Sequence, residues 1–257
     1  MATTVTQLRE RWAAGRPAHG VWSLLPGAVT GELLAGTGAD YVVLDLQHGA
    51  LGETDLPGVT AAVSAAGAVP LVRTRSAHPA DIGRPLDLGA HGVLVPNVRD
   101  AAHVREVVAA CRYGPTGTRS AGRLVGGADA PLAMIVLETA TALADLDAVL
   151  AVEGLDGVYV GPTDLGLSLG RSGPADRDHV RTVLASIVAR AVAARMPVGV
   201  HAPDGGAQAA GYAALGATIL TAAVDTATLT TAVRHHLALV RDAAGPGAAA
   251  EPGSPPG

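Results

Sequence analysis

The 257-residue sequence predicts an α/β protein, a (β/α)8 TIM barrel with a short N-terminal helix. Short apolar runs alternate with helical segments along almost the whole chain. The runs are apolar at nearly every position, which is typical of parallel strands that are buried on both faces. Eight such pairs of strand and helix over about 240 residues match the size of a TIM barrel.

The elements can be placed in order along the chain. A first helix is expected at 7–15, because Leu8 and Trp12 lie four residues apart on one face, and we expect it to cover the barrel. Strands are expected at 19–25, 41–46, 69–73, 92–95, 133–137, 157–160, 198–200 and 218–222. The helices that follow them are expected at 30–36, 56–66, 81–88, 101–112, 143–152, 177–195, 206–215 and 227–243. A Gly-rich link at 113–130 separates the fourth helix of this series from the fifth strand.

A doubly wound open sheet has the same alternation of strand and helix and is the competing arrangement. No GxGxxG motif follows the first strand, which disfavours the open sheet. We expect residues 1–244 to form a single domain. The Gly/Pro/Ala-rich tail at 245–257 is expected to be disordered, because it cannot bury enough apolar area to become ordered.

The composition excludes several classes of partner. A hydrophobic content of 49% supports a large core, and a net charge of −5 without a block of like charge favours neither nucleic acid nor an anionic membrane. No apolar run has the length of a membrane span, so we expect a soluble cytoplasmic protein with small-molecule partners. The single cysteine, Cys111, cannot form an internal disulfide and is expected to be buried as a small apolar side chain.

All 18 residues in the Lys and Arg count are arginines, and the chain contains no lysine. A Schiff base with a carbonyl substrate needs a lysine amine, as does the internal aldimine of pyridoxal phosphate. The sequence therefore excludes Schiff-base lysine chemistry and pyridoxal-phosphate chemistry.

Polar residues follow six of the expected strands, at the end where a barrel places its active site. They are His48, Arg73, Asn97, Glu138, Asp164 and His201. Since the expected strands themselves carry mostly Val, Leu, Ile and Ala, this gathering of polar residues indicates a functional site rather than simple strand ends.

Glu138 and Asp164 follow adjacent strands, so their carboxylates could share a cation. Two carboxylates, with the other positions left to water and substrate, suit Mg²⁺ or Mn²⁺ better than a structural zinc ion. The alternative is that each residue caps the helix that follows it.

His48 beside such a metal could act as a proton acceptor, although a lone histidine is more often a structural, hydrogen-bonded residue. Arg73 ends an apolar strand and needs an anionic partner there. That partner could be a substrate carboxylate or enolate, or else Glu138 or Asp45. His201 and Asn97 could equally be wall residues. The remaining candidates, His91, His103, His235 and His236, are expected at the surface.

Six segments together resemble the HpcH/HpaI family of metal-dependent 2-oxo acid aldolases, also called the 4-hydroxy-2-oxoheptanedioate aldolase family. They are LDLQHG (44–49), PLVRTRS (70–76), LDLGAHGVLVPNV (86–98), YGPTGTRSAG (113–122), VLET (136–139) and EGLDGVYVGPTDLGLSLG (153–170). The resemblance runs in order over residues 5–240. It implies a (β/α)8 barrel with Mg²⁺, Mn²⁺ or Co²⁺ bound, and a homohexamer built as a trimer of dimers in which the last helix packs on a neighbouring copy.

The resemblance also implies roles for individual residues. Glu138 and Asp164 match the metal ligands, His48 the catalytic base, and Arg73 the arginine that anchors the substrate. Asp87 matches a carboxylate that pairs with the histidine through water, a role that its place within an expected helix would not have indicated.

The turn formed by Gly161, Pro162 and Thr163 matches the loop whose backbone N–H groups receive the substrate carboxylate. Two features depart from the family pattern. Val136 replaces a glutamine, and the link between residues 122 and 132 is shorter than usual.

The activity implied is that of a class II aldolase, which cleaves or forms 4-hydroxy-2-oxo acids through the enolate of pyruvate or a similar 2-oxo acid and releases an aldehyde. The lack of lysine favours this class independently. One alternative is a related carbon–carbon lyase or hydrolase that acts on a thioester or another 2-oxo acid. A second alternative is a barrel that binds a metabolite without turnover.

Overall fold

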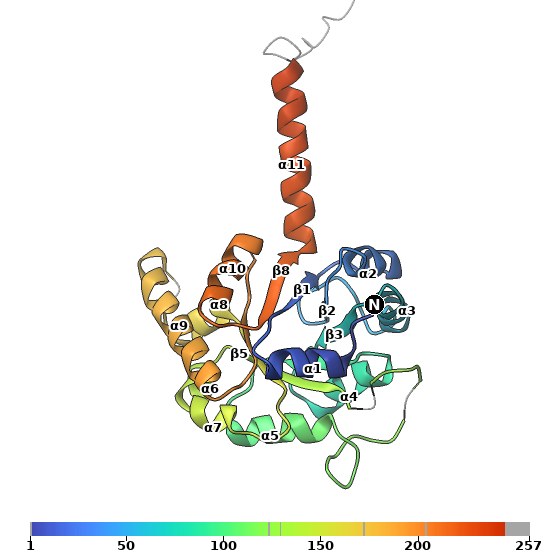
Figure 1. The fold of residues 1–257 in the computed structure, drawn as a ribbon, viewed down its shortest axis with the longest axis vertical. Coiled ribbons are helices and arrows are strands. Elements are labelled where there is room, and N and C mark those ends of the chain that lie inside the picture. The colour runs from blue at the N-terminus through green and yellow to red at the C-terminus, as the bar shows by residue number, and fades with distance from the viewer. Residues whose placement is uncertain (1, 123, 129, 172, 204, 245–257) are drawn as a thin grey trace, which may run out of the picture.

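Eight parallel strands close into a barrel in chain order, as the sequence predicts (Figure 1). The computed structural model describes residues 2–122, 124–128, 130–171, 173–203 and 205–244. The strands are β1 (Ala18–Ser23), β2 (Tyr41–Asp45), β3 (Val69–Arg73), β4 (Gly92–Val95), β5 (Leu132–Leu137), β6 (Gly157–Val160), β7 (Val198–Val200) and β8 (Ile219–Val224). β8 pairs with β1, so the sheet has no free edge and the open-sheet alternative is wrong.

Helices surround the barrel. They are α2 (Ala28–Ala35), α3 (Leu56–Ala65), α4 (Pro79–Asp87), α5 (Ala101–Ala110), α6 (Ala140–Ala144), α7 (Leu146–Leu150), α8 (Pro162–Ser168), α9 (Arg177–Ala193), α10 (Gly206–Ala214) and α11 (Asp225–Ala244), with a 3-10 turn, η1, at Pro174–Asp176. The single helix expected at 143–152 is two short helices, and α8 was not expected. Pro162, which the sequence placed in a turn with Gly161 and Thr163, stands in the first turn of α8, where a missing N–H costs nothing.

The N-terminal helix α1 (Val5–Ala13) covers the barrel, as expected. Leu8 and Trp12 are buried in the same apolar cluster as the barrel interior, and the Trp12 indole donates a hydrogen bond to the carbonyl of Thr218 at 3.2 Å. The helix begins at a capping box formed by Thr4 and Gln7.

Two apolar clusters make up the core. One fills the layer between the strands and the surrounding helices, and the other fills the barrel interior. The interior contains Tyr41 and Tyr159, and glycines on neighbouring strands make room for these rings. A Cβ atom at Gly20 would lie 2.1 Å from the Tyr41 ring, and one at Gly199 would lie 2.9 Å from the Tyr159 ring.

Cys111 is buried, as predicted, and burial raises the pKa of its thiol to about 12. The expectation for His103 is wrong. His103 lies on the buried face of α5 with Val107 and Ala110, at a spacing of i, i+4 and i+7. His91 is half-buried, whereas His235 and His236 are exposed as expected.

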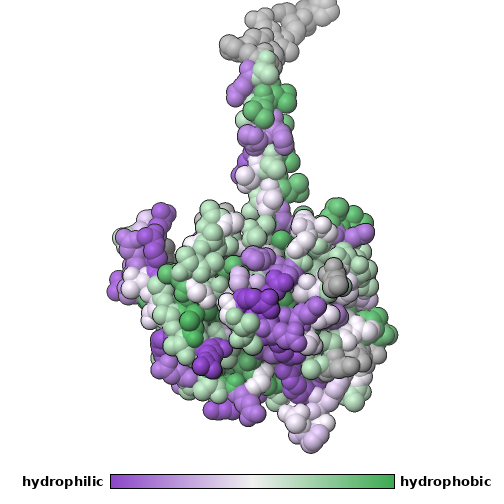
Figure 2. All heavy atoms as spheres, viewed as in Figure 1, coloured by the Kyte–Doolittle hydropathy of each residue, from purple (hydrophilic) through white to green (hydrophobic). Residues whose placement is uncertain are grey.

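The last helix, α11, projects from the barrel rather than lying along it (Figure 1). Its first residue, Asp225, accepts hydrogen bonds from the Ser23 hydroxyl and from the amides of Leu24 and Leu25, which holds the start of the helix against the end of β1. Apolar side chains are exposed along the projecting part (Figure 2). Among the residues that the structure describes, no helix is both long enough and apolar enough to span a bilayer. The tail at 245–257 lies outside the described residues.

Candidate active site

The side chains at the mouth of the barrel follow from the two-residue repeat of the strands. Successive side chains of a strand point to opposite faces, so the residues at i, i+2 and i+4 all point inward. Tyr41 and Val43 belong to the interior cluster, and Asp45 is the next inward residue on β2. By the same count, Arg73 follows Val69 and Leu71 on β3. Glu138, the first residue after β5, continues the inward series of Leu132, Met134 and Val136.

Asp45 and Arg73 are paired directly across β2 and β3. The Arg73 Nε atom donates to Asp45 Oδ1 at 2.9 Å, and Nη2 donates to Oδ2. The Trp22 indole donates to the same carboxylate at 2.9 Å, and the Arg73 guanidinium lies 5.1 Å from the centre of the Trp22 ring. The sequence left Glu138 and Asp45 open as ion-pair partners of Arg73, and the structure shows that the partner is Asp45.

Burial alone would raise the pKa of Asp45, but the hydrogen bonds and charge of Arg73, with help from Trp22, hold the pKa below its ordinary value. The Arg73 Nη1 atom contacts no acceptor in the described part of the chain and remains available to a ligand.

The Asp45 carboxylate also shapes the loop that carries His48. It accepts hydrogen bonds from the amides of Gln47 at 2.9 Å and His48 at 3.1 Å. Gly49 completes the turn, since a Cβ atom there would lie 2.2 Å from the Asp45 carbonyl oxygen. The imidazole of His48 is exposed at the mouth and has no hydrogen-bond partner among the described residues.

Glu138 is buried, and the first of its carboxylate oxygens, Oε1, accepts a hydrogen bond from the amide of Asn97 at 2.7 Å. Burial raises the pKa of Glu138, and the negative charge of Asp164 raises it further, against the opposing effects of the Asn97 amide and Arg73. Asp164 lies in the first turn of α8 and is exposed. Within the described residues, neither carboxylate caps a helix, because Thr139 caps α6 and α8 has no side-chain cap.

These two carboxylates fit a divalent cation. The Oε2 atom of Glu138 and both oxygens of Asp164 accept no hydrogen bond from a described residue. These oxygens are therefore free to coordinate a hard cation such as Mg²⁺ or Mn²⁺. Nowhere in the described residues do three or more His, Cys, Asp or Glu side chains gather to hold a metal. Water and substrate would therefore complete the coordination sphere.

His201 lies beside these groups. Its ring packs edge-on against Trp22, with centroids 5.0 Å apart, and against Tyr159 at 6.2 Å. Burial, assisted by the positive charge of Arg73, lowers the pKa of His201 to about 4, so the imidazole is neutral near pH 7. Its Nδ1 atom is buried without a hydrogen-bond partner among the described residues.

A cavity of about 150 Å³ joins most of the side chains predicted from the sequence. Its lining consists of Trp22, His48, Arg73, Val136, Glu138, Tyr159, Gly161, Pro162, Thr163, Asp164 and His201. Asn97 contributes its backbone N–H rather than its side chain, which is exposed. Its φ of 57° is a conformation that asparagine tolerates better than most residues.

Asp87 does not lie in this cavity. It is the last residue of α4, and a helix of a barrel runs back from the mouth toward the opposite end. Its carboxylate accepts a hydrogen bond from Arg119 at 2.6 Å, and both residues line a separate cleft of about 460 Å³. The proposed pairing of Asp87 with His48 is therefore not present within one chain.

Sequence reasoning missed Trp22 and Tyr159 as parts of the site, and it considered Asp45 only as a partner for Arg73. The two-residue repeat within β2 would have shown that Asp45 points into the barrel together with Tyr41. No such signal in the sequence indicated Trp22, because its place in the site depends on a hydrogen bond to Asp45 on the neighbouring strand β2.

Comparisons with known proteins show which sequences and structures this chain resembles. The family model described as HpcH/HpaI aldolase/citrate lyase matches residues 19–232. A hydroxypyruvate/pyruvate aldolase of Rhizorhabdus wittichii is 35% identical over 250 residues, which cover 92% of this chain and 99% of the relative. A 4-hydroxy-2-oxo-heptane-1,7-dioate aldolase of Salmonella dublin is 32% identical over 230 residues, which cover 84% of this chain and 87% of the relative.

Solved structures show the same likeness. A family protein from Burkholderia cenocepacia superposes with a TM-score of 0.84 at 27% identity, covering 91% of this chain and 98% of that one. The citrate synthase SbnG superposes with a TM-score of 0.81 at 28% identity, covering 92% of this chain and 98% of that one.

Proposed function

The chain belongs to the HpcH/HpaI aldolase/citrate lyase family, and on that premise we propose that it is a divalent-metal-dependent aldolase that cleaves or forms 4-hydroxy-2-oxo acids. The observation that carries the proposal is that a single cavity joins two carboxylates, Glu138 and Asp164, to His48 and Arg73. The names of the relatives, which describe aldolases of hydroxypyruvate, pyruvate and a 4-hydroxy-2-oxo acid, support the substrate class.

Glu138 and Asp164 would hold Mg²⁺, Mn²⁺ or Co²⁺. When bound, the metal supplies a Lewis acid that stabilises negative charge on the oxygens of the 2-oxo acid. The chain supplies the other groups. The free Nη1 of Arg73 would donate to the substrate's carboxylate or enolate oxygen. The backbone N–H of Thr163, in the first turn of α8, would face the substrate carboxylate.

In the cleavage direction, His48 accepts the proton of the 4-hydroxyl, directly or through water. The electron pair of that O–H bond forms the aldehyde carbonyl, and the C3–C4 bond breaks to leave the enolate of pyruvate. Protonation at C3 then gives pyruvate. Asp45 accepts hydrogen bonds from both the guanidinium of Arg73 and the backbone of His48, so one buried carboxylate positions two groups of the proposed mechanism.

A direct test is pyruvate release from a 4-hydroxy-2-oxo acid. Excess chelator should abolish it and Mn²⁺ or Mg²⁺ should restore it. His48→Ala should lower the rate by a factor of about 10²–10⁴, the usual contribution of a general base. His179→Ala is the control, because His179 is exposed on α9 and does not line the cavity. Full activity in excess chelator would refute metal dependence. Binding of pyruvate without exchange of its methyl protons would favour a barrel that has lost turnover.

We also propose that the active form is a homohexamer, a trimer of dimers, in which α11 packs against a second copy. Leu229, Val233, Leu237 and Val240 form an exposed apolar stripe along α11, at helical spacing. An unsupported helix of 20 residues with such a stripe is marginal in water. Light scattering after size exclusion should show an oligomer, and the double substitution Val233→Asp and Leu237→Asp should dissociate it. A wild-type monomer at micromolar concentration would contradict the proposal.

A further inference from the structure

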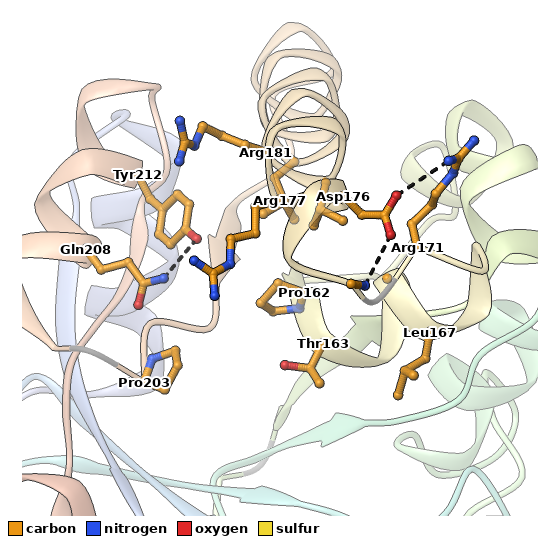
Figure 3. A pocket seen from close by; sticks show the side chains of 14 residues that line it. Pro162, Thr163, Leu167, Arg171, Asp176, Arg177, Arg181, Pro203, Gln208 and Tyr212 are labelled. Atoms are coloured by element: carbon orange, nitrogen blue, oxygen red, sulfur yellow. Dashed lines mark hydrogen bonds and ion pairs between the residues drawn. The ribbon is translucent and has the colours of Figure 1, made fainter.

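A second, larger cleft of about 840 Å³ opens beside the candidate active site (Figure 3). Its walls come from α8, from the first turns of α9 and from α10. Pro162 and Thr163 line both the cleft and the smaller cavity that contains Glu138 and Asp164. A ligand that fills the cavity could therefore extend past these two residues into the cleft.

The sizes of the two spaces suggest a division of roles. The cavity of about 150 Å³ is small compared with ligand sites, which commonly measure about 300–1,000 Å³. A cavity of this size suits a small 2-oxo acid such as pyruvate. The remainder of a longer 4-hydroxy-2-oxo acid, which leaves as the aldehyde, needs further space, and the cleft is the adjoining space.

The charges that line the cleft are mainly positive. Three arginines, Arg171, Arg177 and Arg181, face one carboxylate, Asp176, among the described lining residues. Arg171 is already paired with Asp176 at 3.4 Å. Arg181 lies 3.3 Å from Asp178, but both side chains are largely exposed, so this pair is weak.

Arg177 differs from the other two arginines. Its side chain makes no hydrogen bond or ion pair with any residue that the structure describes. Its guanidinium points into the cleft, between Pro162 and the ring of Tyr212 (Figure 3). A guanidinium in a cleft binds carboxylates and phosphate esters through two parallel hydrogen bonds. The apolar side chains of Val180 and Leu184 line the same cleft and would limit its hydration.

We propose that this cleft binds the far end of the aldehyde portion of the substrate, and that this end carries an anionic group, a phosphate ester or a carboxylate, held by Arg177. The inference rests on the proposed aldolase function and names the class of aldehyde that it uses. Arg177 is then a specificity-determining residue. It contacts the substrate away from the bond that breaks, and Arg181 adds positive charge at the outer rim.

Steady-state kinetics of aldol synthesis test this with pyruvate as donor and three aldehydes as acceptors. Glyceraldehyde is neutral, succinic semialdehyde carries a carboxylate, and glyceraldehyde 3-phosphate carries a phosphate. Wild-type protein should have a higher kcat/KM for at least one anionic aldehyde than for glyceraldehyde, and the preferred anion identifies the group. Arg177→Gln should lower the ratio of anionic to neutral kcat/KM by about 10- to 100-fold, the usual effect of losing a hydrogen-bonded charge. The loss should fall mainly on KM.

Arg190→Gln is the matched control. Arg190 lies on the same helix, but it is paired with Asp147 at 2.8 Å and does not line the cleft, so the ratio should not change. An equal ratio in wild-type and Arg177→Gln proteins, with normal turnover, would overturn the inference and leave the aldolase proposal standing. Absence of both turnover and metal-dependent exchange of the pyruvate methyl protons in the wild-type protein would overturn the proposed function, and this inference with it.

Discussion

Replacing Asp45 by Asn should be one of the most damaging conservative substitutions in this protein. The carboxylate is fully buried and accepts hydrogen bonds from Arg73, Trp22 and two backbone amides. The asparagine oxygen could still receive the two amides. The same oxygen could also accept from Arg73 Nε, but the NH₂ group would face the donors Arg73 Nη2 and Trp22 Nε1. Among the described residues, the guanidinium would lose its only counter-charge in direct contact. Removal of one partner from a buried ion pair costs about 3–5 kcal/mol.

For a chain of this size, 1 kcal/mol corresponds to about 2–4 °C in Tm, so we expect Asp45→Asn to lower Tm by about 6–20 °C. Thermal and denaturant unfolding followed by circular dichroism measure the change. Asp147→Asn is the control, because Asp147 forms a largely exposed pair with Arg190, and such pairs contribute about 1 kcal/mol or less. In a double-mutant cycle, Asp45→Asn combined with Arg73→Gln should cost less than the sum of the single changes.

A loss of stability below about 1 kcal/mol for Asp45→Asn would refute the reasoning, because it would mean that the Asp45 charge is screened by water despite its burial. Additive effects in the cycle would show that Asp45 and Arg73 do not act as a pair.

Three further outcomes are expected. Burial lowers the pKa of His201 from 6.5 to about 4, so between these pH values the unfolded chain binds a proton that the folded chain does not. The contribution of His201 to stability should be complete above pH 6.5 and fall toward pH 4 by at most about 1.4 kcal/mol per pH unit. Denaturant titrations should show a smaller loss for His201→Asn than for wild type. Gly20→Ala should destabilise by about 1–3 kcal/mol because its Cβ would overlap the Tyr41 ring, whereas Gly83→Ala, on an open helix position, should be neutral or stabilising in the same unfolding assay. Cys111 should resist iodoacetamide in the native protein at pH 8 and react after unfolding, as mass spectrometry would show; rapid native labelling would contradict its burial.

The barrel could be predicted from the sequence because two features indicate its strands, their apolar composition and their regular spacing. The carboxyl-end residues could be predicted for the same reason, since Glu138 and Arg73 each interrupt an apolar run. The helix α8 could not, because a proline after a strand is equally consistent with a turn and with the first turn of a helix.

Contacts between elements distant in the sequence were beyond prediction. The partner of Arg73 depended on the register of β2 against β3, and the sequence left two acidic residues open, Asp45 and Glu138. The pair formed by Asp87 and Arg119 depended on the path of the Gly-rich link. A helical position for Asp87 indicated nothing about which cleft it would line.

The two-residue repeat that points Asp45, Arg73 and Glu138 into the barrel also restricts how this chain can change in length. One residue inserted or deleted within β2, β3 or β5 would turn the terminal polar side chain outward, into the apolar layer beneath the helices. Loop segments beyond the site residues carry no such restriction. Insertions and deletions among related chains should therefore be confined to those loops, where they can reshape the outer cleft and leave the ionised groups of the mouth in place.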